Sequence, residues 1–132
     1  MNKSVLLLLG VLTFSAFASS PEVIKEYLLI QEKLAADSTE GVADAAKKIV
    51  SLEKKSKVSL AAQKLVALNE IKEIRKEFKK LSTEIIAATP KKDLKDAKVA
   101  FCPMANAKWL QKGDEIRNPY YGSSMLECGG FE

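Results

Sequence analysis

Apolar residues recur every three or four positions over most of the chain, a period that predicts amphipathic helices. Ser20-Pro21-Glu22 combines a capping residue, a first-turn proline and an acid, so a first helix is expected over 21–36. A second pattern follows Asp37–Glu40, whose residues have capping-box spacing. The longest pattern runs over 59–88, with Asn69 as the expected kink or short connection. The prediction is a mainly α fold, an antiparallel bundle of three or four helices.

The pattern changes character after this helical region. Val99–Phe101 is typical of a brief extended segment, and Lys112–Asp114 of a turn with Trp109 and Ile116 at strand-like spacing around it. Aliphatic residues become scarce here. Residues 99–132 are therefore expected to form an irregular Cys/Met-containing cap of short strands or turns on the bundle.

The first eighteen residues have the parts of a secretory signal peptide. Lys3 precedes an apolar run from Val5 to Phe14, and Ala16-Phe17-Ala18 is a small-x-small cleavage site. The run is shorter than the roughly 20 residues that span a bilayer. We expect cleavage after Ala18, a periplasmic or secreted domain over 19–132, and no stable membrane insertion after cleavage.

Charge and composition narrow the classes of function. Without Lys3, twenty basic and seventeen acidic residues are interleaved, which argues against a nucleic-acid partner. The lysines fall opposite the apolar stripes, as on solvated helix faces, and weak attraction to anionic membranes is the less favoured alternative. The chain has no histidine, the commonest acid–base group near neutral pH and the commonest metal ligand. We therefore expect that the protein is not an enzyme.

Two sulfur pairs stand at the two ends of the cap. Cys102 and Met104 are two residues apart, and Met125 and Cys128 are three apart. In an oxidising compartment a Cys102–Cys128 disulfide is the default for two cysteines. It would close a loop of about 27 residues, worth roughly 3 kcal/mol in the chain-entropy model. The spacing alone favours this disulfide.

The same four residues are also candidate metal ligands. Thiolate and thioether are the soft donors that select Cu(I) and, by extension, Ag(I). Each cysteine has a methionine beside it, and the third methionine is the initiator. The two interpretations are compatible, because a disulfide can be the oxidised, metal-free state.

Aromatic and polar residues between the sulfur pairs are candidates for a supporting role. Trp109 can fill a small core or shield a soft cation through its ring face. Tyr120 and Tyr121 are expected to pack against the helices. Asn118 is expected to fix its own turn through the backbone.

The order of these residues carries a resemblance to a known family. It consists of an aromatic-Cys-Pro-Met run at 101–104, then Trp109-Leu110, Ile116 with Asn118–Gly122, Met125-Leu126 and Cys128-Gly129. The helical region matches only in outline, through Arg75, Phe78 and Leu81. This order resembles the bacterial family known as domain of unknown function thirty-three forty-seven. Members occur as small exported proteins or on the adaptor subunits of heavy-metal efflux pumps.

The resemblance implies metal handling by association. The expected function is a periplasmic Cu(I)- or Ag(I)-binding accessory protein in heavy-metal efflux or homeostasis, with an efflux adaptor or another envelope protein as partner. The alternative is a disulfide-stapled helical protein-interaction module without metal.

Overall fold

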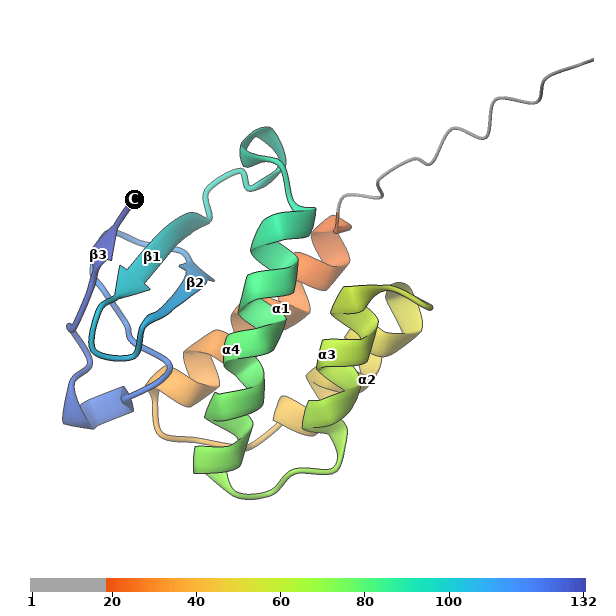
Figure 1. The fold of residues 1–132 in the computed structure, drawn as a ribbon, viewed down its shortest axis with the longest axis horizontal. Coiled ribbons are helices and arrows are strands. Elements are labelled where there is room, and N and C mark those ends of the chain that lie inside the picture. Colours follow the sequence, from red (N-terminus) through yellow and green to blue (C-terminus); the bar gives the residue numbers. More distant parts are fainter. Residues whose placement is uncertain (1–18) are drawn as a thin grey trace, which may run out of the picture.

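The computed structural model describes residues 19–132, so the predicted signal peptide lies outside the described residues. Four helices pack against each other and are followed by a small antiparallel sheet (Figure 1). The helices are α1 (Pro21–Ala35), α2 (Val42–Leu52), α3 (Lys57–Val66) and α4 (Ile71–Ala88). The predicted mainly α fold is confirmed, and the bundle has four helices rather than three.

The long helical pattern is two helices. α3 ends at Val66 and α4 begins at Ile71, so Asn69 lies in a short connection as predicted. A serine caps α1 and another caps α3: Ser20 Oγ accepts a hydrogen bond from Val23 N at 3.3 Å, and Ser56 Oγ accepts one from Ser59 N at 2.9 Å.

The predicted capping box before α2 is wrong. α2 begins after Gly41, which has a φ of 77° and supplies no side-chain cap. Asp37, the expected cap, instead directs its carboxylate to Arg75 of α4 and to the backbone of Ser123. These two long-range partners replace the local bond that the spacing predicted.

A short 3-10 turn, η1 (Lys91–Asp93), leads into the sheet. The strands β1 (Lys98–Cys102), β2 (Ala107–Gln111) and β3 (Gly130–Phe131) are arranged in the order β2-β1-β3, all antiparallel. A second 3-10 turn, η2 (Gly122–Ser124), precedes β3. The extended segment predicted at Val99–Phe101 is β1.

The spacing around Lys112–Asp114 predicted extended segments on both sides of that turn, but the observed strands pair differently. β2 pairs with β1 through the turn at 103–106, and Ile116 lies outside the strands. The buried side chain of Gln111 explains the irregular course of the following loop. Its Nε2 donates to the carbonyls of Lys112 and Glu115 at 3.2 and 2.7 Å, and its Oε1 accepts from Arg117 N at 2.9 Å.

Bundle and sheet share one core. The sheet lies beside α1 and α4, with α2 and α3 on the other side of them (Figure 1). Tyr27 of α1 stacks on Phe78 of α4 with ring centroids 5.0 Å apart. The Tyr27 hydroxyl also lies 2.6 Å from Ser82 Oγ and accepts a hydrogen bond from Leu110 N of β2 at 3.1 Å. Within residues 19–132, every helix is too short or too polar to cross a bilayer.

Candidate functional site

The two cysteines meet at the edge where β1 and β3 pair. Cys102 is the last residue of β1 and is buried, while Cys128 is half-buried and lies two residues before β3. The antiparallel register places Phe101 opposite Gly130. This register brings residues 102 and 128 together, and their Sγ atoms lie 3.1 Å apart as free thiols.

Gly129 allows this close approach of the backbone. Its φ is 132°, a conformation that other residues rarely adopt. A Cβ at this position would lie 2.7 Å from the carbonyl oxygen of Phe101 and 3.0 Å from the ring of Trp109. A glycine is therefore required beside the thiol pair.

The surroundings make the two thiols unequal. Burial acts to raise the pKa of Cys102, but hydrogen bonds from Cys128, Ala105 N–H, the Asn118 side chain and the Met104 backbone lower it below its usual value. The pKa of Cys128 is raised by its hydrogen bond to Cys102, by burial and by the adjacent charge. We therefore expect Cys102, which also accepts a hydrogen bond from Ala105 N at 3.4 Å, to lose its proton first, with the Cys128 S–H as donor to the thiolate.

The two methionines lie on the turns that adjoin the thiol pair. Met104 is in the turn after β1, and its side chain is 67% exposed. Met125 is half-buried, and its carbonyl accepts a hydrogen bond from Cys128 N at 3.1 Å. The structure thus brings the two thiols together, whereas convergence of all four sulfur atoms stays a prediction.

Asn118 is buried and fixes the chain on the Cys128 side. Its Oδ1 accepts hydrogen bonds from Tyr120 N at 2.8 Å and Tyr121 N at 3.2 Å, which is the local turn that the sequence suggested. Its Nδ2 donates to the carbonyl of Cys128 at 2.8 Å. One amide side chain therefore joins the aromatic turn to the cysteine.

The aromatic residues form a packed layer next to the thiols. Trp109 is fully buried, and its Nε1 donates to Gln111 Oε1 at 2.9 Å. Tyr120 meets the Trp109 ring edge-on, with centroids 5.9 Å apart, and lies at the same distance from Phe78 of α4. Burial raises the pKa of Tyr120 well above its usual value. Tyr120 thus packs against a helix as expected.

Arg75 and Asp37 anchor the cap to the helices, a role that sequence reasoning missed. The Arg75 guanidinium donates to the carbonyls of Pro119 and Leu34 at 2.8 and 2.7 Å and to Asp37 Oδ1 at 2.8 Å. The other Asp37 oxygen accepts from Ser123 N at 3.1 Å. Hydrogen bonds from Ser123 and Arg75 lower the pKa of Asp37 to about 2. The feature of the sequence that could have indicated this role is the position of Arg75, a charged residue at the edge of an apolar helical stripe.

The donors that this site offers are soft. Thiolates and thioethers suit Cu(I) and Ag(I). Within residues 19–132, the thiol pair included, no three Cys, Asp or Glu side chains gather into a group that could hold a metal ion.

Comparison with known proteins yields no relative: no family model, no curated protein and no solved structure matches the chain. The resemblance to the family of unknown function rests mainly on the cap residues and stays a prediction.

Proposed function

We propose that the protein binds Cu(I) or Ag(I) in the cell envelope and passes the ion to, or senses it for, a heavy-metal efflux or homeostasis system. The observation that carries this proposal is the distance of 3.1 Å between the Sγ atoms of Cys102 and Cys128 in the folded cap. A paired thiol site with two thioethers on the adjoining turns has the donor chemistry of a Cu(I) site. The proposed role is binding and transfer rather than catalysis.

The lowered pKa of Cys102 favours this role. A metal binds the thiolate rather than the thiol, so a cysteine that loses its proton more readily binds at lower pH. The surrounding hydrogen bonds are provided by the folded cap before any ion arrives. The first bond is therefore expected to form at Cys102.

Cys128 is expected to move when an ion binds. Two collinear metal–sulfur bonds of about 2.3 Å each, the zinc–thiolate value, would hold the sulfurs farther apart than 3.1 Å. Cys128 is only half-buried and is followed by Gly129, so it is the partner that can shift. The same exposure provides the route for transfer: an incoming thiolate or thioether replaces one donor before the other releases the ion.

Titration of the reduced protein with Cu(I) against a competing chelator tests the proposal. We expect one ion per chain in the wild type and at least a hundredfold loss of affinity in Cys102→Ser and in Cys128→Ser. Helical circular dichroism of each variant controls for folding. Absence of uptake by the reduced wild type would refute the proposal.

Two further variants separate a two-thiol site from a four-sulfur site. Met104→Leu and Met125→Leu each remove a thioether while keeping the size of the side chain. A loss of Cu(I) affinity in either variant adds that methionine to the ligand set. Unchanged affinity in both restricts the site to the cysteines.

The same contact also favours a second candidate function, a disulfide-stapled interaction module for an efflux adaptor or another envelope protein. Neighbouring thiols in an oxidising compartment form a disulfide readily. Mass spectrometry of protein isolated from the envelope identifies this alternative. The mass would be lower than that of the dithiol by two hydrogens, would not change with mild reductant, and would include no copper. In that case the metal proposal is wrong and the bridge is structural.

A further inference from the structure

The positive charge of the described chain is concentrated on the hairpin formed by α2 and α3. Residues 42–66 contain six lysines and two acidic residues, a net charge of +4. The rest of residues 19–132 contains fourteen basic and fifteen acidic residues, a net charge of −1. Of the six lysines, Lys48 pairs with Glu26 at 3.6 Å, and the other five form no ion pair with the described residues.

Exposed leucines flank the lysines at the hairpin tip, which we define as residues 52–60. Leu52, the last residue of α2, is 50% exposed, and Leu60, in the first turn of α3, is 67% exposed. Three exposed lysines lie between them, at positions 54, 55 and 57. Exposed lysines beside exposed apolar side chains match a lipid interface, where leucine enters the headgroup region and lysine meets phosphate.

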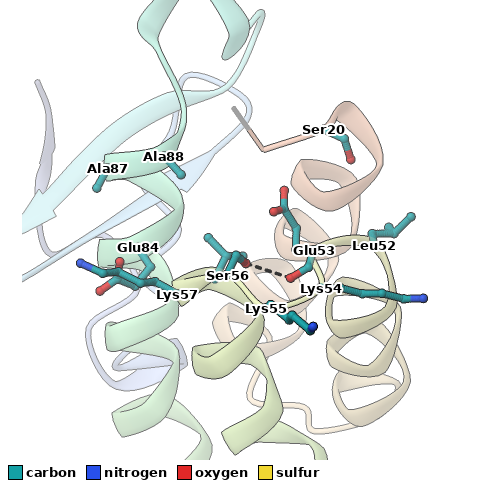
Figure 2. A pocket seen from close by; sticks show the side chains of 11 residues that line it. Ser20, Leu52, Glu53, Lys54, Lys55, Ser56, Lys57, Glu84, Ala87 and Ala88 are labelled. Atoms are coloured by element: carbon teal, nitrogen blue, oxygen red, sulfur yellow. Dashed lines mark hydrogen bonds between the residues drawn. The ribbon is translucent and has the colours of Figure 1, made fainter. Parts of the chain in front are cut away.

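The hairpin tip lies at the end of the bundle where the N-terminal segment joins the fold. A hollow of about 720 Å³ is lined by the tip, by Ser20 before α1, and by Ala87 and Ala88 at the end of α4. Figure 2 shows Lys54 extending from the loop and Lys57, the first residue of α3, extending the opposite way toward Glu84 of α4, with Ser20 across the hollow. In the sequence, the apolar run Val5–Phe14 ends only five residues before the described chain begins.

We propose that the hairpin tip docks on the surface of an anionic phospholipid bilayer. The lysines contact lipid phosphates, and Leu52 and Leu60 enter the interfacial layer. A precursor whose apolar N-terminal run is in a membrane would present this tip to the same bilayer. The proposal is independent of the metal site, because none of its residues contacts the thiol pair.

Vesicle flotation tests the docking. The chain recovered from the cell envelope, with its N-terminus established by mass spectrometry, is mixed with phosphatidylglycerol–phosphatidylcholine vesicles or with phosphatidylcholine vesicles. We expect flotation with the anionic vesicles only, and a decline as salt rises, because salt screens contacts between lysine and phosphate. No flotation with anionic vesicles, or equal flotation with both kinds, would overturn the proposal.

Matched variants locate the contact. Lys54→Glu/Lys55→Glu should weaken binding at least about tenfold. Lys72→Glu/Lys76→Glu makes the same change of charge at the start of α4, the opposite end of the bundle, and should change binding less than twofold. Equal losses of vesicle binding in the two double variants would show that binding depends only on net charge, and would overturn the assignment to the tip. Circular dichroism confirms that each variant is folded.

The apolar contact and the competing kind of partner are tested in the same assay. Leu52→Gln/Leu60→Gln should also weaken flotation at constant charge, and no effect would remove the leucines from the docking surface and overturn that part of the proposal. An acidic protein is the other possible occupant. If polyglutamate in solution competes fully with the vesicles at equal charge concentration, the tip is a general polyanion site and the lipid assignment is wrong.

Discussion

At the scale of single residues, the chemistry of the cap depends on which of two adjacent thiols loses its proton first. Hydrogen bonds converge on Cys102 and lower its pKa, whereas the pKa of Cys128 is raised by its role as donor to Cys102. The pair thus holds one negative charge more readily than two, as coupled groups in contact do. Cys102 is the first ligand in this account, and Cys128 the second.

Removal of Cys128 should raise the pKa of Cys102. In Cys128→Ala the donor is lost while the burial that disfavours the thiolate remains. Titration of the reduced protein by the ultraviolet absorbance of the thiolate checks this directly. The wild type should show a first thiolate below the usual cysteine range, and the variant a single thiolate at higher pH. An unchanged or lower value in the variant would contradict the proposed hydrogen bond.

At the scale of elements, the cap is held on the bundle by the contact between η2 and the end of α1. Gly122 has a φ of 55°, and a Cβ there would lie 1.9 Å from Asp37 Oδ1 and 2.5 Å from the Arg75 guanidinium. The loop that leads to Cys128 therefore depends on a glycine seated against an ion pair. A Cβ at position 122 therefore fits only if the ends of the Asp37 and Arg75 side chains move.

Gly122→Ala should destabilise the protein more than Gly41→Ala. Both glycines have positive φ, which costs alanine about 1–2 kcal/mol. Position 41 has open space around it, whereas a Cβ at position 122 must also displace the Asp37–Arg75 pair that it would contact. Urea denaturation of the two variants measures the difference. Equal losses would contradict the close packing of η2 on the Asp37–Arg75 pair.

The Asp37 carboxylate should give this contact a pH dependence. Its pKa in the folded protein, about 2, lies below the unfolded value of about 3.9. The carboxylate therefore stabilises the fold above about pH 4, and this contribution is lost as the pH falls toward 2. The stability gap between wild type and Asp37→Asn should close over that interval, measured by urea midpoints. Glu127→Gln, an exposed change of the same type, is the control, and a gap independent of pH would contradict the prediction.

Periodicity predicted the helices well because their buried faces are built from aliphatic side chains at regular spacing. It did not separate three helices from four, because the apolar stripe continues across the break between Val66 and Ile71. The capping box failed because Asp37 has partners 38 and 86 residues away, Arg75 and Ser123, which local spacing cannot reveal. Such bonds are determined by tertiary packing.

The sequence predicted only part of the candidate site, because tertiary packing also determines the rest of it. The spacing of Cys102 and Cys128 suggested a pair, and the register of β1 with β3 brings them together. Nothing in the spacing of residues indicated that Gln111 would hold the neighbouring loop, since a buried glutamine has no periodic pattern. Where the methionine sulfur atoms lie relative to the thiols is likewise a matter of side-chain conformation rather than spacing.

At the scale of the whole molecule, the sheet and the bundle are expected to unfold as one cooperative unit. Tyr27 bonds to both α4 and β2, and Trp109, the only tryptophan, lies fully buried in the shared core. Trp109 fluorescence reports on the sheet and helical circular dichroism on the bundle. The two denaturation curves should coincide. Separate midpoints would show that the cap folds independently.

X-ray absorption at the copper edge of the reduced protein, loaded with one equivalent of Cu(I), tests directly whether Cys102 and Cys128 bind the ion. We expect a coordination shell of sulfur with at least two scatterers, and loss of that shell in the Cys102→Ser/Cys128→Ser protein. A shell of nitrogen or oxygen, or a sulfur shell that persists without both cysteines, would contradict it.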